Sequence, residues 1–302
     1  MSLFDLTDLT LVSHDAGGAQ ILSSWACECS TKSSSVVDGP ARAIFREILP
    51  KTHFISLEDS LKKTSTFITG TSWQSDLEKI AIKKAKSAGI YSISILDHWV
   101  TYKERFCIDS TYCFPDELWV VDKYALKLAQ LSFNDIPITL IDNSYFKRID
   151  KEINTSCFSS NVTSKNVTSA LYICESTDDY SLLISSTKSA FGYSQQESYE
   201  YFLKNILEIY PSLKRLVIRP HPSQSPLSIE WMLNYNVDFT LSVSSEFPLI
   251  DQILCSDLVI GMESMALVVA LRCKKKVLSV MPPSSGPLTL PFEEIDELRQ
   301  LI

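Results

Sequence analysis

The chain has 302 residues, of which 45% are hydrophobic and 21% charged, a composition typical of a globular protein with two domains or one large one. Its 36 Asp and Glu outnumber its 28 Lys and Arg, and the net charge of −8 argues against nucleic acid as a partner, because nucleic-acid binding uses a basic face. None of its eight Cys forms a CxxC pair, so no zinc site is predicted and a reducing compartment is expected.

The start of the chain has neither the basic segment nor the apolar run of a signal peptide, and no apolar run is as long as a membrane span. We therefore expect a cytoplasmic protein. The one basic run, Lys274-Lys275-Lys276, is typical of a solvated turn between a helix and a strand. The alternative is contact with a charged glycan or with the inner face of the membrane, as a peripheral association.

Strand-like and helix-like runs alternate through the first half of the chain. The clearest helix is 76–88, whose apolar residues fall on one face, whose start carries the capping pair Ser75-Asp76 and whose end is Gly89. The other expected helices are 19–29 and 124–131. The expected strands are 9–13, 36–37, 52–57, 66–69, 91–96, 118–121 and 138–141.

Residues 143–170 are rich in Ser, Thr, Asn and Lys and lose the periodicity, so we interpret them as a link between two domains. The alternation then resumes, with strands at 171–174, 216–218, 237–241, 258–260 and 277–280 and helices at 195–210, 249–255, 263–272 and 293–302. The predicted fold class is α/β, with two Rossmann-like domains, residues 1–150 and 151–302, facing across a cleft.

The most informative segment is the strand that ends near Ile218 and is followed by Arg219, Pro220, His221 and Pro222. In an open α/β sheet, ligands bind beyond the carboxyl ends of the strands. The two prolines restrict the loop, so His221 is held where it can donate to a phosphate oxygen, and Arg219 adds a charge that pairs with phosphate. A structural role is the alternative for a lone histidine, but the flanking prolines favour a role in binding.

A second strand of this half ends at Gly261 and leads into a helix that begins near Glu263 and Ser264. The free N–H groups of a helix start, together with the Ser264 hydroxyl, predict an anion-binding site. Glu263 is expected to contact ribose hydroxyls, or else only to stabilise the helix N-terminus by its charge. Ser284 and Ser285 lie in a turn after the apolar strand 277–280 and are candidates for further hydroxyls in the same donor site.

In the first half, His14 and Asp15 follow the first strand and precede Gly17 and Gly18 at the start of the first helix. Glycines at this place let a ligand or another backbone segment approach closely. Two interpretations are open: a tight turn in which Asp15 caps the helix, or a catalytic site in which Asp15 is the general base and His14 modulates or replaces it. The pattern is not GxGxxG, so no dinucleotide cofactor is predicted.

Two further strands of this half end in polar or aromatic residues. Thr71 follows the strand 66–69, and its hydroxyl either caps the next helix or binds a sugar oxygen of the acceptor. Asp97, His98 and Trp99 follow the strand 91–96, and Arg105 comes soon after. Asp97 and His98 are rival candidates for the base, Trp99 for stacking on a sugar ring, and Arg105 for pairing with an anionic group. The alternative is a buried Asp97 and a Trp99 that anchors the domain.

The chain contains no DxD, HExxH or GxSxG motif, so neither a metal site of the acidic-pair type nor a bound metal is predicted. Its Arg-Pro-His-Pro loop, followed later by Gly-Met-Glu-Ser, resembles the donor half of bacterial GT-B-fold glycosyltransferases, above all sialyltransferases and capsule Kdo transferases; CDP-glycerol polymerases share a similar pattern. The resemblance implies that His221 and Ser264 bind the phosphate of a CMP-sugar and that Asp15 acts as the base.

The expected function is therefore metal-independent glycosyl transfer in bacterial surface polysaccharide synthesis, of capsule or lipopolysaccharide. The expected donor is a nucleotide sugar, at best guess a CMP-activated 2-keto sugar acid such as Kdo or a nonulosonic acid. The acceptor is a glycan or a lipid-linked glycan. The alternatives are a nucleotide-sugar epimerase or a phospho-polyol or phosphoribosyl transferase on the same fold, and a non-catalytic sugar-nucleotide-binding subunit.

Overall fold

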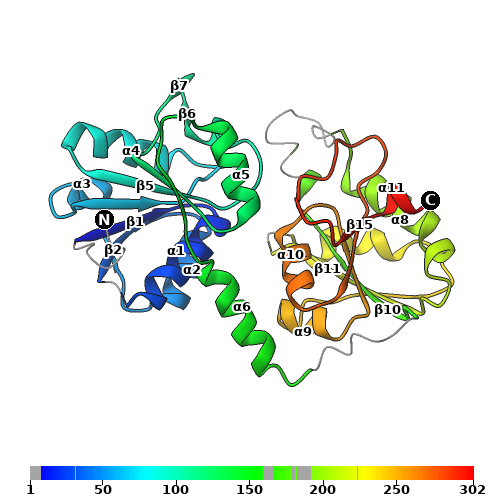
Figure 1. Ribbon diagram of the computed structural model, residues 1–302. Helices are drawn as coiled ribbons and strands as arrows, with labels where there is room; N and C mark the ends of the chain where they lie inside the picture. Colours follow the sequence, from blue (N-terminus) through cyan, green and yellow to red (C-terminus); the bar gives the residue numbers. More distant parts are fainter. Residues whose placement is uncertain (1–7, 31, 159–165, 179–180, 182–191, 223) are drawn as a thin grey trace. The chain divides into compact units, whose positions relative to one another are not determined.

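The computed structural model describes residues 8–30, 32–158, 166–178, 181, 192–222 and 224–302. The chain divides into two compact units, Met1–Arg148 and Ile149–Ile302. The division falls inside helix α6 (Ser144–Thr155), drawn in green in Figure 1. In the part of the chain that the structure describes, no helix combines the length and apolar character that a membrane span requires.

Unit 1 is built on a seven-stranded sheet in the order β3-β2-β1-β4-β5-β8-β9, and every neighbouring pair in it is parallel. Its strands are β1 (Leu9–Ser13), β2 (Ser33–Val37), β3 (His53–Phe54), β4 (Thr66–Thr69), β5 (Tyr91–Leu96), β8 (Glu117–Val120) and β9 (Ile138–Leu140). A two-stranded antiparallel hairpin, β6 (Cys107–Ile108) and β7 (Thr111–Tyr112), follows the 3₁₀ helix η1 (Glu104–Phe106).

Helices cover both faces of this sheet. The helices are α1 (Ala16–Glu28), α2 (Ala41–Ile48), α3 (Leu57–Ser60), α4 (Leu77–Ala88) and α5 (Lys123–Ser132). Alternate residues of β1 point to opposite faces: Leu11 packs in one core with α1 and α2, and Val12 packs in another with α3 and α4. Because both faces are buried, β1 and β4 are buried along their whole length, as expected for a parallel sheet.

Unit 2 is built on a six-stranded parallel sheet in the order β12-β11-β10-β13-β14-β15. Its strands are β10 (Ser169–Ile173), β11 (Arg215–Arg219), β12 (Thr240–Val243), β13 (Leu258–Gly261), β14 (Lys276–Ser279) and β15 (Ile295–Glu297). Its helices are α8 (Gln195–Ile209), the 3₁₀ helix η2 (Pro226–Leu233), α9 (Leu249–Leu254), α10 (Met265–Arg272) and α11 (Leu298–Leu301).

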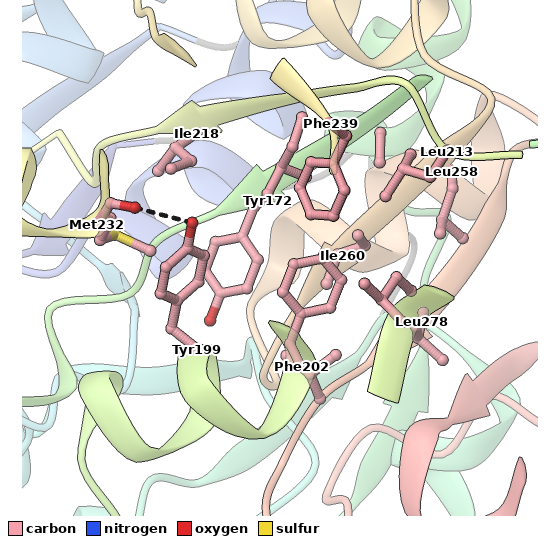
Figure 2. Packing of buried hydrophobic residues seen from close by; sticks show 14 of the residues in the cluster. Tyr172, Tyr199, Phe202, Leu213, Ile218, Met232, Phe239, Leu258, Ile260 and Leu278 are labelled. Atoms are coloured by element: carbon pink, nitrogen blue, oxygen red, sulfur yellow. Dashed lines mark hydrogen bonds between the residues drawn. The ribbon is translucent and has the colours of Figure 1, made fainter. Parts of the chain in front are cut away.

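An aromatic cluster fixes α8 on this sheet (Figure 2). Tyr172 of β10 meets Tyr199 of α8 edge to face, with ring centroids 5.2 Å apart, and Phe202 packs beside both. The Tyr199 hydroxyl donates to the carbonyl oxygen of Met232 at 3.0 Å, so the polar end of this buried ring is satisfied. This core fixes the position of β10, whose carboxyl end carries the candidate site of unit 2.

The predicted α/β class with parallel sheets is confirmed, whereas one helix was missed and one expected helix is wrong. Residues 144–155, inside the segment 143–170 that was interpreted as a link between two domains, form α6, whose polar composition hides a narrow apolar stripe of Tyr145, Ile149 and Ile153. The helix expected at 293–302 is the strand β15 followed by one short turn of helix, because buried Ile295 pairs with Val277 at the sheet edge.

Candidate functional site

In each unit, the predicted residues gather where the chain order of the sheet reverses. The first strand of each sheet, β1 or β10, is central, and the chain crosses to one side of it before it crosses to the other. Ligands bind at the carboxyl ends of the strands at such a switch point. The loops after β1, β4 and β5 form one candidate site, and the loops after β10, β11 and β13 form another.

His14 and Asp15 form a hydrogen-bonded pair in the loop after β1. Nδ1 of His14 lies 2.7 Å from Oδ1 of Asp15, and Oδ2 of Asp15 accepts the backbone N–H groups of Trp73 at 2.8 Å and Gln74 at 3.3 Å. Because the carboxylate can only accept, the proton of a neutral imidazole lies on Nδ1, and Nε2 keeps its lone pair. This is the arrangement of a histidine base oriented by a carboxylate.

Gly39, which the sequence did not suggest, makes room for this imidazole. It adopts φ +53°, and a Cβ on it would lie 2.4 Å from Nε2 of His14. Any side chain at this position would displace the ring, and an L-residue would also be strained there. Gly18, one of the two glycines predicted to allow a close approach, packs against Gly70: a Cβ on Gly18 would lie 3.0 Å from the Cα of Gly70.

Glu78 is a second group that sequence reasoning missed. This residue in the first turn of α4 is 2% exposed, and its Oε1 accepts the backbone N–H of His14 at 2.8 Å and the hydroxyl of Ser72. The Ser72 oxygen in turn accepts the backbone N–H of Asp15 at 3.0 Å. Burial raises the pKa of Glu78. The carboxyl thus ties together the loops after β1 and β4, and its only sequence signal is an acidic residue at a helix start.

Asp97 lies on the first turn of α1, together with three other predicted residues. Its Oδ1 accepts the hydroxyl of Thr71 at 3.0 Å and lies 3.4 Å from Nη1 of Arg105, which also donates to the Thr71 carbonyl at 2.7 Å. A Cβ on Gly17 would lie 2.3 Å from Oδ2 of Asp97. The structure therefore brings Gly17, Thr71, Asp97 and Arg105 together, with the carboxylate near a helix N-terminus, where negative charge is favourable.

Of the neighbouring residues, His98 is half-buried and Trp99 is buried. Burial lowers the pKa of His98, which favours a neutral imidazole. Trp99 is 6% exposed, and its Nε1 donates to Oδ2 of Asp122 at 3.0 Å. Trp99 therefore anchors the loop after β5 and presents no open face for the sugar stacking expected from the sequence, because packing covers its ring.

In unit 2, Arg219 ends β11 and His221 follows it, and the two residues have different surroundings. Nη1 of Arg219 donates to the carbonyl of Phe247 at 2.8 Å and to Oε1 of Gln252 at 2.6 Å, so the described contacts of the guanidinium brace the segment before α9. His221 is half-buried, and its backbone N–H donates to the Gln224 side chain at 3.2 Å. Pro222 beside it is exposed. The described contacts of Arg219 thus hold α9 and the segment before it, while His221 lies in the loop after β11.

The N–H groups at the start of α10 already hold an anion of the chain itself. Oε1 of Glu175, the second residue after β10, accepts the backbone N–H groups of Met262 at 2.9 Å, Glu263 at 2.9 Å and Ser264 at 3.0 Å. Burial, and then the nearby charge of Glu263, raise the pKa of Glu175 to about 7, against the opposing effect of the three hydrogen bonds. Glu175 was missed, although the strand-end rule that selected His221 also applies to it.

The other predicted residues of unit 2 lie around this cluster or apart from it. The Ser264 hydroxyl caps α10 by accepting the Ala266 N–H at 3.1 Å, and Glu263 accepts the hydroxyl of Thr289 at 2.7 Å.

Gly261 is buried in β13, where a Cβ would lie 3.2 Å from Leu267. Ser285 donates to the Pro282 carbonyl within its own turn, and a Cβ on Gly192 would lie 3.1 Å from the carbonyl oxygen of Ser284. Within the described ranges, His, Cys, Asp and Glu form no group of three or more suited to a metal ion.

No family model matches the chain, and no curated protein matches it. Among solved structures, it is similar to a UDP-GlcNAc 2-epimerase from Neisseria meningitidis bound to UDP-GlcNAc, with 11% identity, a TM-score of 0.57 and coverage of 95% of this chain and 86% of that chain. It is also similar to MnaA of S. aureus in a co-structure with UDP, with 14% identity, a TM-score of 0.59 and coverage of 90% and 79%. A putative UDP-N-acetylglucosamine 2-epimerase from Listeria monocytogenes gives 12% identity, a TM-score of 0.57 and coverage of 91% and 79%. At these identities the likeness establishes the fold: the chain has the two-domain Rossmann-like architecture of GT-B type.

Proposed function

We propose that this protein is an enzyme acting on a nucleotide sugar, and that unit 2 binds the phosphate of that donor at the start of α10. The observation that carries the proposal is the convergence of three backbone N–H groups, from Met262, Glu263 and Ser264, on one carboxylate oxygen at the switch point of the sheet. A site that holds a carboxylate oxygen suits a phosphate oxygen equally well. His221 lies in the loop after β11, the strand that pairs with β10, and its side chain is proposed to donate to the same phosphate.

Nucleotide-sugar chemistry is the choice supported by the fold. The N. meningitidis structure contains UDP-GlcNAc and the S. aureus structure contains UDP. The sequence resemblance to sialyltransferases and Kdo transferases adds the finer proposal of a CMP-activated 2-keto sugar acid as donor, with a glycan or lipid-linked glycan as acceptor in surface polysaccharide synthesis. No DxD motif occurs in the chain, so we propose that main-chain N–H groups and His221 stabilise the leaving phosphate.

For transfer, the proposed base is His14, oriented by Asp15. Nε2 of His14 takes the proton of the acceptor hydroxyl while the oxygen of that hydroxyl bonds to the anomeric carbon of the donor. The bond from the anomeric carbon to the phosphate oxygen breaks, and the nucleotide leaves with the electron pair. Asp15 stabilises the imidazolium that forms. This modifies the expectation from the sequence, in which Asp15 itself was the base, because its carboxylate already accepts His14 and two N–H groups. Asp97 remains the rival candidate.

A nucleotide-sugar 2-epimerase is the second candidate function. It is favoured by the three similar solved structures described above, two of which are named as such enzymes or putative ones and all of which share the fold. An epimerase needs no acceptor, and its product is still a nucleotide sugar. The two activities therefore differ in whether free nucleotide is released: transfer releases it, and epimerisation does not.

The test is a donor panel of UDP, CMP, UDP-GlcNAc and a CMP-linked 2-keto sugar acid, measured first by thermal shift and then by turnover. A ligand that binds the folded state raises the melting temperature in proportion to the logarithm of its concentration over its Kd. Transfer releases free nucleotide when a glycan acceptor is added, whereas epimerisation changes the sugar and keeps the nucleotide bound to it. Binding without turnover indicates a non-catalytic subunit. The proposal fails if no nucleotide or nucleotide sugar binds, or if His221→Ala leaves binding unchanged.

A further inference from the structure

Trp73 is an exposed aromatic side chain at the candidate site of unit 1. It is 43% exposed, whereas Trp25, Trp99 and Trp119 of the same unit are at most 6% exposed. It lies in the loop after β4, and its backbone N–H donates to Oδ2 of Asp15 at 2.8 Å. The loop that fixes the His14–Asp15 pair therefore also presents an indole to the solvent.

The indole is supported from one side by a guanidinium that is itself held in place. Cζ of Arg105 lies 5.9 Å from the ring centroid of Trp73, and Nη1 of Arg105 donates to the Thr71 carbonyl and lies beside Asp97. A cation over one face is attracted by the ring electrons and restricts the orientation of the ring. The exposed part of the indole is thus preorganised, which lowers the entropic cost of stacking a ligand on it.

The chemistry around this ring favours a sugar over a nucleobase. The carboxylate of Asp15, which accepts the Trp73 N–H, can accept hydrogen bonds but cannot donate them when ionised. A pyranose offers several hydroxyl donors and an apolar face of C–H groups. The hydrogens of these C–H groups carry the partial positive charge that the indole face attracts. A pyrimidine base instead offers a single donor group, N3–H of uracil or the 4-amino group of cytosine, beside carbonyl oxygens that carboxylates repel.

We propose that Trp73 is the stacking platform of an acceptor subsite in unit 1, which takes a pyranose ring of a neutral glycan and directs its hydroxyls toward the His14–Asp15 pair. This inference rests on the proposed function, because it names the class of acceptor for that reaction. It assigns to Trp73 the role that the sequence suggested for Trp99, which the structure buries.

The experiment measures binding of lactose, N-acetyllactosamine and chitobiose to the full chain by saturation-transfer NMR, with uridine and cytidine as comparison ligands. Trp73→Ala removes the ring but keeps the N–H that holds Asp15, so the His14–Asp15 pair stays in place. We expect Trp73→Ala to weaken binding of the best disaccharide about 3- to 10-fold, the range of an aromatic contact, and Trp73→Phe to weaken it less. Tyr112→Ala is the matched control, because Tyr112 is an exposed aromatic residue of the same unit, at 52% exposure.

Three results would overturn the inference: no disaccharide gives a signal with the wild-type chain, Trp73→Ala binds the best disaccharide as tightly as the wild type, or the nucleosides bind in a Trp73-dependent way and the sugars do not. UDP binding to the same variants keeps this test separate from the proposed function. If Trp73→Ala loses the disaccharide and keeps UDP, both stand. If the wild type binds no nucleotide but shows Trp73-dependent sugar binding, the proposed enzyme activity fails and the platform remains.

Discussion

Each unit places one of its own carboxylates at the N-terminus of a helix at the switch point of its sheet, but the two carboxylates are stabilised differently. Asp97, at α1, is paired with the Arg105 guanidinium and the Thr71 hydroxyl. Glu175, at α10, accepts three backbone N–H groups and faces a second carboxylate, Glu263. Both carboxylates lie at a helix N-terminus at a switch point, although Asp97 follows β5 and Glu175 follows β10, and their charge compensation differs. A carboxylate paired with a cation is a fixed part of the structure, and one without such a partner is easier to replace by a ligand.

The largest effect should come from removing the cation of unit 1. Asp97 and Arg105 have side chains only 10% and 11% exposed, so Arg105→Ala leaves a buried charge without its partner and is expected to cost about 3–5 kcal/mol of unfolding free energy. Urea unfolding of the full chain, followed by tryptophan fluorescence, measures it. Adding Asp97→Asn in the same chain should restore part of the loss. A loss below about 1 kcal/mol would show that the pair behaves as a surface ion pair.

Glu175 should make the stability of unit 2 depend on pH. Its pKa is about 7 in the folded chain and 4.5 ordinarily, so between these values the folded state holds more protons than the unfolded state. The contribution of Glu175 to the free energy of unfolding is therefore fully present below about pH 4.5. It falls as the pH rises toward 7, by up to about 1.4 kcal/mol per pH unit. Glu175→Gln keeps an oxygen that accepts the three N–H groups and should flatten this dependence. Unfolding curves at several pH values test it, and an unchanged slope in the variant contradicts the assignment.

The close packing of Asp97 against α1 predicts that replacing Gly17 by alanine destabilises the chain, contrary to the usual effect in a helix. In most helices Gly→Ala is stabilising, because alanine has the higher helix propensity. At Gly17 the added Cβ would lie 2.3 Å from Oδ2 of Asp97, so we expect Gly17→Ala to destabilise the chain by about 1–3 kcal/mol. Gly286→Ala is the control, since nothing lies within 4 Å of its Cβ position. Equal melting temperatures for both variants would mean that Asp97 moves aside freely.

The smallest predicted effect concerns the cap of α10. Replacing an N-cap serine by alanine typically costs about 1 kcal/mol, and we expect this for Ser194→Ala at the capping box of α8. Ser264→Ala should cost the same, about 1 kcal/mol, because the Ala266 N–H that the Ser264 hydroxyl caps is not one of the three N–H groups that Glu175 accepts. If Ser264→Ala costs much less than Ser194→Ala, another acceptor takes over the Ala266 N–H in the variant. Thermal unfolding of the two single variants decides this.

The strand-end rule predicted much of the arrangement from the sequence. Apolar runs identified β1, β4, β5 and β13, and the polar residues that follow them are those that the structure gathers at the switch points. The pairing of Thr71, Asp97 and Arg105 follows from the adjacency of β4 and β5, which the alternation of strands and helices suggests. The roles of these residues in binding or catalysis stay predictions.

What the sequence could not supply were facts of tertiary packing. Glu175 and Glu78 are single acidic residues beside ordinary elements, and their partners come from loops up to 89 positions away. Trp73 and Trp99 both follow strands, and only packing decides that one is exposed and the other buried. The same holds for α6, because its apolar stripe is too narrow to stand out from a polar composition.

The carboxylate of Glu175 also sets a threshold for any ligand of the α10 start. A ligand gains only the difference between its own interaction with the three N–H groups and that of the carboxylate it replaces. Weak monovalent anions such as acetate gain nothing by this exchange, whereas a phosphate ester offers more charge and more acceptor oxygens. For the proposed donor site, this predicts discrimination among anions before any contact with the sugar, and Glu175→Gln should relax this discrimination.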